Sequence, residues 1–148
     1  MAGVGLGVDI ERDTSLRSIG ALAGRIDDPA TALELAGVHM LRSIQRNFDA
    51  IGRPERWAPN APGTIARKGS SKPLVDTGWL MNSVRFHTTP TQLVLEADGP
   101  GARIHQFGGE TGRGHAVTIP ARPYMLFQDE DLVDIAGVYE DFLADGRA

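Results

Sequence analysis

Two segments carry the side chains best suited to chemistry: residues 104–109 are Ile-His-Gln-Phe-Gly-Gly, and residues 118–124 are Thr-Ile-Pro-Ala-Arg-Pro-Tyr. A histidine beside a glycine pair, followed by an arginine between two prolines, could form the floor of an active site or a rigid piece of structure. An active site needs a nucleophile, an acid–base pair or a metal close to these residues. None lies near them in the sequence, so the pattern favours structure.

The glycines and prolines indicate how such a structure is built. Gly108 and Gly109 predict a chain reversal in which one residue has positive φ, and Ile104 and Phe107 are expected to anchor it in the core. The flanking prolines fix φ and hold the residues before them extended, which presents Arg122 in a defined direction. A rigid guanidinium suits a carboxylate partner, within the chain or across a subunit contact. The predicted structural motif consists of His105, Phe107, Gly108, Gly109, Pro120, Arg122 and Pro123.

The rest of the chain lacks the familiar patterns of catalytic and metal sites. There is no cysteine, which excludes thiolate sites and disulfides. His39 has Ser43, not a second ligand, four residues on, and no Gly-x-Ser-x-Gly elbow occurs. The run of alternate glycines from Gly3 to Gly7 has neither a preceding strand nor a phosphate-binding lysine after it. We therefore predict no catalytic residue, no metal site and no cofactor, and a hydrolase centred on His105 is the most distant alternative.

Length and charge set further limits. A chain of 148 residues suits a single domain, and a net charge of −4 argues against a general DNA-binding protein, although a local basic patch is compatible with it. The apolar runs are too short for a membrane span, and the N-terminus lacks the basic and apolar regions of a signal peptide. These features predict a soluble protein that is not exported and has no membrane partner.

The elements expected to position the two segments follow from local signals. A helix is predicted over residues 14–25, and a long one from Asp28 and Pro29 down to Gly52, with apolar residues from Leu33 to Ile51 on one face. A hairpin is predicted over 84–97, a third strand over 115–120 and a short helix over 77–83. The predicted domain is α+β: N-terminal helices, one of them long, a long basic loop or arm over 53–73, a small mainly antiparallel sheet, and a C-terminal helix over 129–143. The inward face predicted for that last helix consists of Leu132, Ile135, Val138, Tyr139 and Phe142. Residues 1–13 are predicted to be a flexible tail.

At the two segments described first, the sequence resembles the phage virion morphogenesis family, the tail-completion proteins of Mu-like tailed phages. Three further stretches agree with that family in order: Trp57-Ala-Pro, then Thr64-Ile-Ala-Arg-Lys, then Leu74-Val-Asp-Thr-Gly-Trp-Leu-Met-Asn-Ser-Val. The resemblance covers about residues 30 to 136. Tyr124 stands where a phenylalanine is expected, and Gly112-Arg113-Gly114 enriches the turn between the two signature segments.

The resemblance implies a non-enzymatic virion component that completes the tail or neck and helps join head to tail. Related neck proteins form rings, and by analogy with rings on the tail axis six copies are expected. The implied partners are copies of the same chain and other neck, connector or tail proteins. The implied location is the virion, after synthesis in the host cytoplasm.

Charge is unevenly spread in a way that suits a ring. Residues 53–72 hold five basic residues against one acid, and residues 128–147 hold seven acids against one base. We predict that the basic arm of one subunit lies near the acidic start of the next subunit's final helix, with Trp57 docked on a neighbour or on its own domain. Two alternatives stay open: both clusters are solvated faces, or the arm over 64–72 contacts DNA. The predicted interface residues are Arg53, Arg56, Trp57, Arg67, Lys68, Lys72, Asp129, Glu130, Asp131 and Asp134.

Overall fold

The computed structural model describes residues 12–145, with side chains from residue 17 onward. The tail predicted over residues 1–13 lies almost wholly outside this part of the chain. Its helices are α1 (Arg12–Asp27), α2 (Ala30–Asp49), α3 (Pro62–Lys68), α4 (Trp79–Asn82), α5 (Ala102–Phe107) and α6 (Asp129–Asp145). Its strands are β1 (Val84–Thr88), β2 (Leu93–Ala97), β3 (Gly109–Thr111) and β4 (Val117–Ile119), with a short 3-10 turn, η1 (Arg113–His115), between the last two. The arrangement is α+β, as predicted. None of the helices described has the length and apolar character that a membrane crossing requires.

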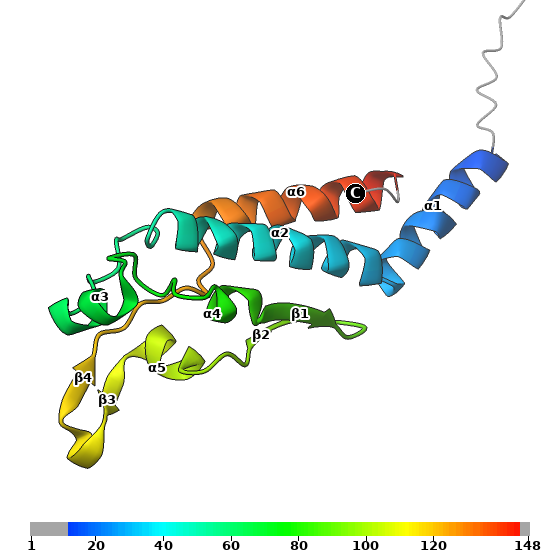
Figure 1. The fold of residues 1–148 in the computed structure, drawn as a ribbon. Coiled ribbons are helices and arrows are strands. Elements are labelled where there is room, and N and C mark those ends of the chain that lie inside the picture. Colours follow the sequence, from blue (N-terminus) through cyan, green and yellow to red (C-terminus); the bar gives the residue numbers. More distant parts are fainter. Residues whose placement is uncertain (1–11, 146–148) are drawn as a thin grey trace, which may run out of the picture.

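Helices α2 and α6 lie side by side, and α1 leads away from one end of this pair (Figure 1). The predicted long helix is α2, but its start is shifted by one residue. Pro29 takes the N-cap position, while the Asp28 carboxylate accepts a hydrogen bond from the Ala30 N–H at 3.3 Å. The helix ends before Gly52, whose φ of 102° is a conformation that glycine adopts without strain.

Strands β1 and β2 form the predicted hairpin and pack on α2. They pair antiparallel, with Val84 opposite Ala97 and Thr88 opposite Leu93. Gly37 makes this packing close, because a Cβ at that position would lie 2.4 Å from the ring of Phe86.

The predicted third strand becomes β4, but it does not extend that hairpin. It pairs with β3 to form a second antiparallel pair that projects from the body of the domain (Figure 1). Helix α5 and strand β3 are not predicted from the sequence. Phe107, expected in the core, ends α5 with its side chain 73% exposed, so that expectation is wrong.

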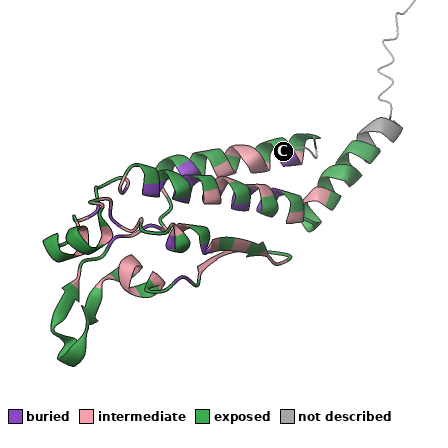
Figure 2. Cartoon of the chain, in the orientation of Figure 1, coloured by how far each residue is buried: buried purple, intermediate pink, exposed green. Residues whose placement is uncertain are grey.

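The core lies where α2 meets the segments around Trp57, Leu80 and Tyr124 (Figure 2). The Phe48 and Trp57 rings pack edge to face with centroids 5.4 Å apart, and the Tyr124 ring lies 5.6 Å from that of Phe48. Trp57 therefore docks on its own domain. The predicted structureless arm over residues 53–73 is also partly regular, since it contains α3.

The C-terminal helix forms as predicted, although its inward face differs. Phe142 is buried as expected, whereas Leu132 is exposed and Asp131 is fully buried. A charged side chain thus occupies a position facing α2, and the contacts that allow this are described below.

Candidate functional site

Arg122 fastens the segment before α3 to the segment before α6. Its side chain is buried, and its Nε and Nη2 donate hydrogen bonds to the backbone carbonyls of Ala58 and Pro59 at 2.8 and 2.9 Å. Burial lowers the pKa of the guanidinium below its ordinary value. The two hydrogen bonds show that Arg122 binds backbone carbonyls within its own chain, so the prediction of a carboxylate partner is wrong within the described chain. The Trp57 indole adds a parallel bond, from Nε1 to the Pro123 carbonyl at 3.0 Å.

Gln106 joins α5 to the same segment in a way that the sequence did not suggest. Its Oε1 accepts hydrogen bonds from the N–H groups of Tyr124 and Met125, both at 3.0 Å, and its Nε2 donates to the Met125 carbonyl at 3.0 Å. The Tyr124 hydroxyl donates to the Ala102 carbonyl at 3.2 Å. The amide of Gln106 thus pairs with the backbone as a neighbouring strand would, and it fixes the chain just before α6.

The glycine pair lets two stretches of backbone approach each other. Gly108 has a φ of 73°, and a Cβ there would lie 2.8 Å from the Ala121 nitrogen. The carbonyl of His105 accepts a hydrogen bond from the Arg122 N–H at 2.7 Å. Burial and then the nearby Arg122 charge lower the pKa of the His105 imidazole. The His105 side chain is half-buried and lines a hollow with Leu74 and Asp76, and its Nδ1 is buried with no hydrogen-bond partner among the described residues.

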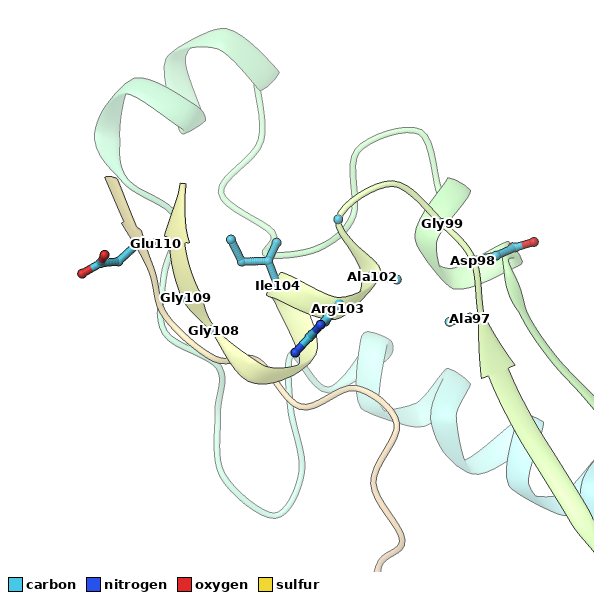
Figure 3. Close-up of a pocket in the computed structure, with 10 residues that line it drawn as sticks. Ala97, Asp98, Gly99, Ala102, Arg103, Ile104, Gly108, Gly109 and Glu110 are labelled. Carbon is cyan, nitrogen blue, oxygen red and sulfur yellow. The ribbon is translucent and has the colours of Figure 1, made fainter. Parts of the chain in front are cut away.

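A cleft of 580 Å³ lies over α5, between the end of β2 and the start of β3 (Figure 3). Glycines form much of its wall, and its charged side chains are Asp98, Arg103 and Glu110. The residues that line it include neither a histidine nor a hydroxyl side chain, so it offers no nucleophile with an adjacent base. Within residues 12–145, no group of three or more histidine or acidic side chains is placed to hold a metal ion.

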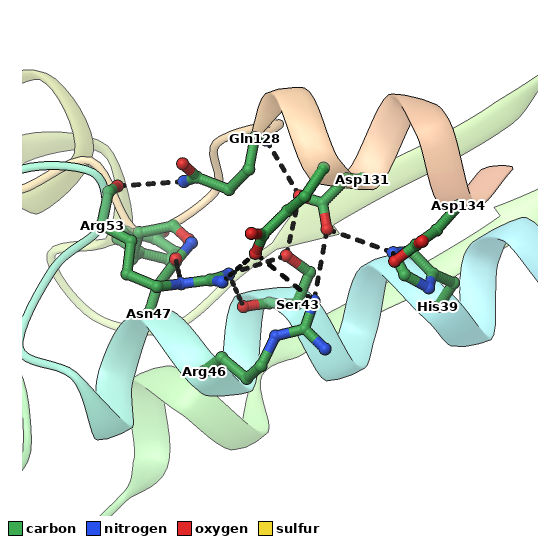
Figure 4. Close-up of polar contacts among 10 residues, drawn as sticks. His39, Ser43, Arg46, Asn47, Arg53, Gln128, Asp131 and Asp134 are labelled. Atoms are coloured by element: carbon green, nitrogen blue, oxygen red, sulfur yellow. Dashed lines mark hydrogen bonds and ion pairs between the residues drawn. The ribbon is translucent and has the colours of Figure 1, made fainter. Parts of the chain in front are cut away.

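The buried Asp131 carboxylate is the centre of a polar network between α2 and α6 (Figure 4). It accepts hydrogen bonds from Ser43 Oγ at 2.7 Å and from the Gln128 N–H at 2.9 Å, and it lies 3.1 Å from His39 Nε2. Arg46 Nη2 approaches it at 3.4 Å. The bond to Gln128 is half of a capping box, because Asp131 is the third residue of α6.

These partners determine how the Asp131 carboxyl group titrates. Burial alone raises its pKa, but the hydrogen bonds from Ser43, the Gln128 N–H and His39, together with the nearby His39 charge, outweigh it and leave the pKa below that of an ordinary aspartate. Histidine and serine both contact the carboxylate rather than each other. The order is therefore not that of a catalytic triad, in which the histidine binds the serine hydroxyl.

Arg53 extends this network from the predicted arm. Its guanidinium donates to Asn47 Oδ1 and to the Ser43 carbonyl, both at 2.9 Å, and contacts Glu130 Oε1 at 2.5 Å. The Gln128 amide donates to the Arg53 carbonyl at 3.0 Å. A basic residue of the arm and the acidic start of α6 therefore meet within one chain, while the predicted contact between two subunits stays a prediction.

The other predicted interface residues divide into two groups. Asp131 is fully buried within its own chain, so its side chain is not available for the predicted contact with another subunit. The Lys68 ammonium donates to the Lys72 carbonyl, and burial lowers the pKa of Lys68 against the opposing influence of Asp76. The side chains that stay exposed are Arg56, Arg67, Asp129, Glu130 and Asp134.

Two neighbouring hollows of 300 and 350 Å³ lie where the segment after α2 meets the segment before α6, and they share Pro54 and Leu126 as lining residues. Trp57 and Pro123 line the first hollow and Phe127 the second, with the Phe127 side chain 53% exposed. We call the two hollows together the junction groove; its remaining lining residues are Arg53, Glu55, Arg56, Ala58, Ala121, Gln128, Asp129 and Glu130.

Two comparisons with known proteins both identify phage proteins. A model of the phage virion morphogenesis family matches residues 11–144. Over 103 residues, 70% of each chain, the sequence is 37% identical to a protein of Haemophilus influenzae (strain ATCC 51907 / DSM 11121 / KW20 / Rd) named Mu-like prophage FluMu G protein 2. No solved structure matches the chain.

Proposed function

The chain belongs to the phage virion morphogenesis family, and on that premise we propose that it completes the tail or neck of a tailed phage and helps to join head to tail. Membership confirms the resemblance found in the sequence and gives the chain a structural role in the phage virion. The observation that carries the proposal is the extent of the family match, which covers nearly every residue described. In this role the protein acts without catalysis, as one copy in an oligomeric ring, with six copies expected by analogy with rings on a tail axis.

The contacts of the two signature segments support a structural role. Arg122 and Gln106 use their side chains on backbone groups of the same chain, which leaves those side chains no part in chemistry on a substrate. The surface carries large apolar side chains on several elements, among them Trp79, Phe107 and Phe127. Ile19, Leu22 and Ile26 are also exposed and share one face of α1, and apolar side chains gathered in this way suit contact with other proteins. The proposed partners are copies of this chain and other neck, connector or tail proteins, and the proposed location is the virion.

The test removes the gene from a phage that carries it. We expect lysates in which heads and tails accumulate apart, visible by electron microscopy, and recovery of joined particles when the wild-type gene is supplied in trans. Mass spectrometry of purified particles should detect the protein in a fixed number of copies. Normal joining without the gene, or purified particles that lack the protein, would contradict the proposal.

A further inference from the structure

Helix α1 carries an apolar face that no residue in the described part of the chain covers. Ile19, Leu22 and Ile26 are 63%, 40% and 62% exposed, and their spacing of three and four residues places them on one side of the helix. Figure 2 shows exposure along most of the described length of α1. Its last turn is held to α6, where Arg25 Nη1 donates to the Leu143 and Ala144 carbonyls at 2.7 and 2.8 Å.

A helix of this length and composition is only marginally stable in water without a packing partner. It has 16 residues, close to the length below which isolated helices are marginal. Gly20 and Gly24 weaken it further, and a Cβ at either position would meet nothing within 4 Å. A partner that covers the Ile19 face would remove this weakness.

The junction groove is a complementary surface at the other end of the molecule. It opens beside the start of α6, whereas α1 begins beyond the opposite end of the α2–α6 pair (Figure 1). Helix α2 alone spans about 30 Å, and α1 leads away from it, so α1 is out of reach of the groove in its own chain. Trp57, Leu126 and Phe127 give the groove an apolar lining.

Charge also fits. Helix α1 contains three arginines and two aspartates, a net charge of +1. The groove lining contains three acids, Glu55, Asp129 and Glu130, against two arginines, Arg53 and Arg56. Opposite charges of this kind favour one orientation of docking.

We propose that α1 of one subunit docks, through Ile19, Leu22 and Ile26, in the junction groove of the next subunit. One chain supplies both halves of this contact at opposite ends, so each copy can bind one neighbour at each end. Head-to-tail contacts of this type form a ring when the rotation closes. The inference rests on the ring of the proposed function and names the surfaces that build it.

The first experiment measures the mass of the full-length chain by light scattering after size exclusion, with circular dichroism to confirm folding. We expect the wild type to give a multiple of 15.9 kDa. Ile19→Asp with Ile26→Asp, and separately Phe127→Asp, should weaken self-association at least tenfold. The matched controls are Ala21→Asp, on the opposite side of α1, and Phe107→Asp, an exposed aromatic outside the groove; both should keep the wild-type mass.

The second experiment uses the absence of native cysteine. Leu22→Cys combined with Phe127→Cys should give, on mild oxidation, a ladder of covalent multiples on a non-reducing gel. Each single variant should stop at a dimer. This result does not depend on variants that could unfold α1.

The outcomes separate the two proposals. A wild-type chain that stays at 15.9 kDa at all concentrations refutes the ring and the docking together. A wild-type oligomer that survives the α1 and groove substitutions, without a ladder in the double-cysteine variant, keeps the ring and refutes the docking. The Phe127→Asp variant could keep its oligomeric mass and yet fail to join heads to tails. In that case the groove binds a different virion protein, and the proposed docking of α1 is refuted.

Discussion

Asp131→Asn tests whether the buried carboxylate holds α6 on α2. The substitution keeps the shape of the side chain and removes its charge. Asparagine retains one oxygen acceptor, and its amide nitrogen replaces the other. Because Ser43 Oγ and the Gln128 N–H both donate to the same carboxylate oxygen, the amide oxygen must turn toward them, which places the amide nitrogen opposite His39 and Arg46.

The magnitude follows from the contacts that change. Hydrogen bonds to a charged group are worth about 1.5–3 kcal/mol, against about 0.5–1.5 for neutral pairs, so each bond that loses its charge forfeits roughly 1 kcal/mol. Four contacts are affected: the hydrogen bonds with Ser43, the Gln128 N–H and His39, and the longer contact with Arg46 at 3.4 Å, which adds little. The expected loss is therefore about 3 kcal/mol in the free energy of unfolding, which lowers the melting temperature by roughly 6–12 °C for a chain of this size.

Asp134→Asn is the matched control, because it makes the same chemical change one turn further along α6. The Asp134 side chain is 57% exposed and lies 3.7 Å from His39 Nε2. An exposed pair of this kind contributes about 0.2–1 kcal/mol, so the control should stay within about 0.5 kcal/mol of the wild type. Urea denaturation at pH 7 compares the two variants. Equal effects of the two substitutions would refute the role assigned to burial.

The pH dependence of the Asp131→Asn effect has a definite sign. The pKa of Asp131 is lowered in the folded chain, so the carboxylate stabilises the fold at any pH above its unfolded value of about 3.9. That contribution is lost as pH falls through the folded pKa. The difference in the free energy of unfolding between wild type and Asp131→Asn should shrink as pH falls below about 4. A difference that grows in acid would contradict this assignment.

The helices and strands that carry a clear sequence pattern within a few residues are predictable from the sequence. The long helix, the hairpin over 84–97 and the C-terminal helix each carry periodicity or turn residues within a short window, and all three form. The positive φ of Gly108 is likewise predictable from a short stretch of sequence, the glycine pair. Helix α5 was missed because six residues are too few to show a period, and α3 because prolines surround it.

The contacts of the candidate site could not be read from the sequence for a physical reason. Asp131 is buried because Ser43 and His39, 88 and 92 residues earlier, face it from another helix. Helical periodicity counts an aspartate as outward-facing, so it placed Leu132 inward instead. The partners of Arg122 are backbone carbonyls, which every residue carries, so no side-chain pattern marks them.

Three further substitutions test the packing described above. Gly37→Ala should lower the free energy of unfolding by about 1–3 kcal/mol, because the new methyl group overlaps the Phe86 ring. Gly24→Ala places its methyl group in open space and should raise the free energy of unfolding by up to about 1 kcal/mol. Equal melting temperatures of the two variants would contradict the close contact between Gly37 and Phe86. His105→Gln should leave folding and particle assembly nearly intact, and loss of a measurable activity with the fold preserved would contradict its structural role. Arg122→Lys keeps the positive charge but replaces a planar fork that bonds two carbonyls at 2.8 and 2.9 Å by a single ammonium group. It should cost about 2–4 kcal/mol, since two charge-assisted bonds are lost or weakened in a buried place. The segment that carries those carbonyls should then be cut faster by proteases. A lysine variant as stable and as resistant as the wild type would show that charge, not the geometry of the fork, fastens the segment.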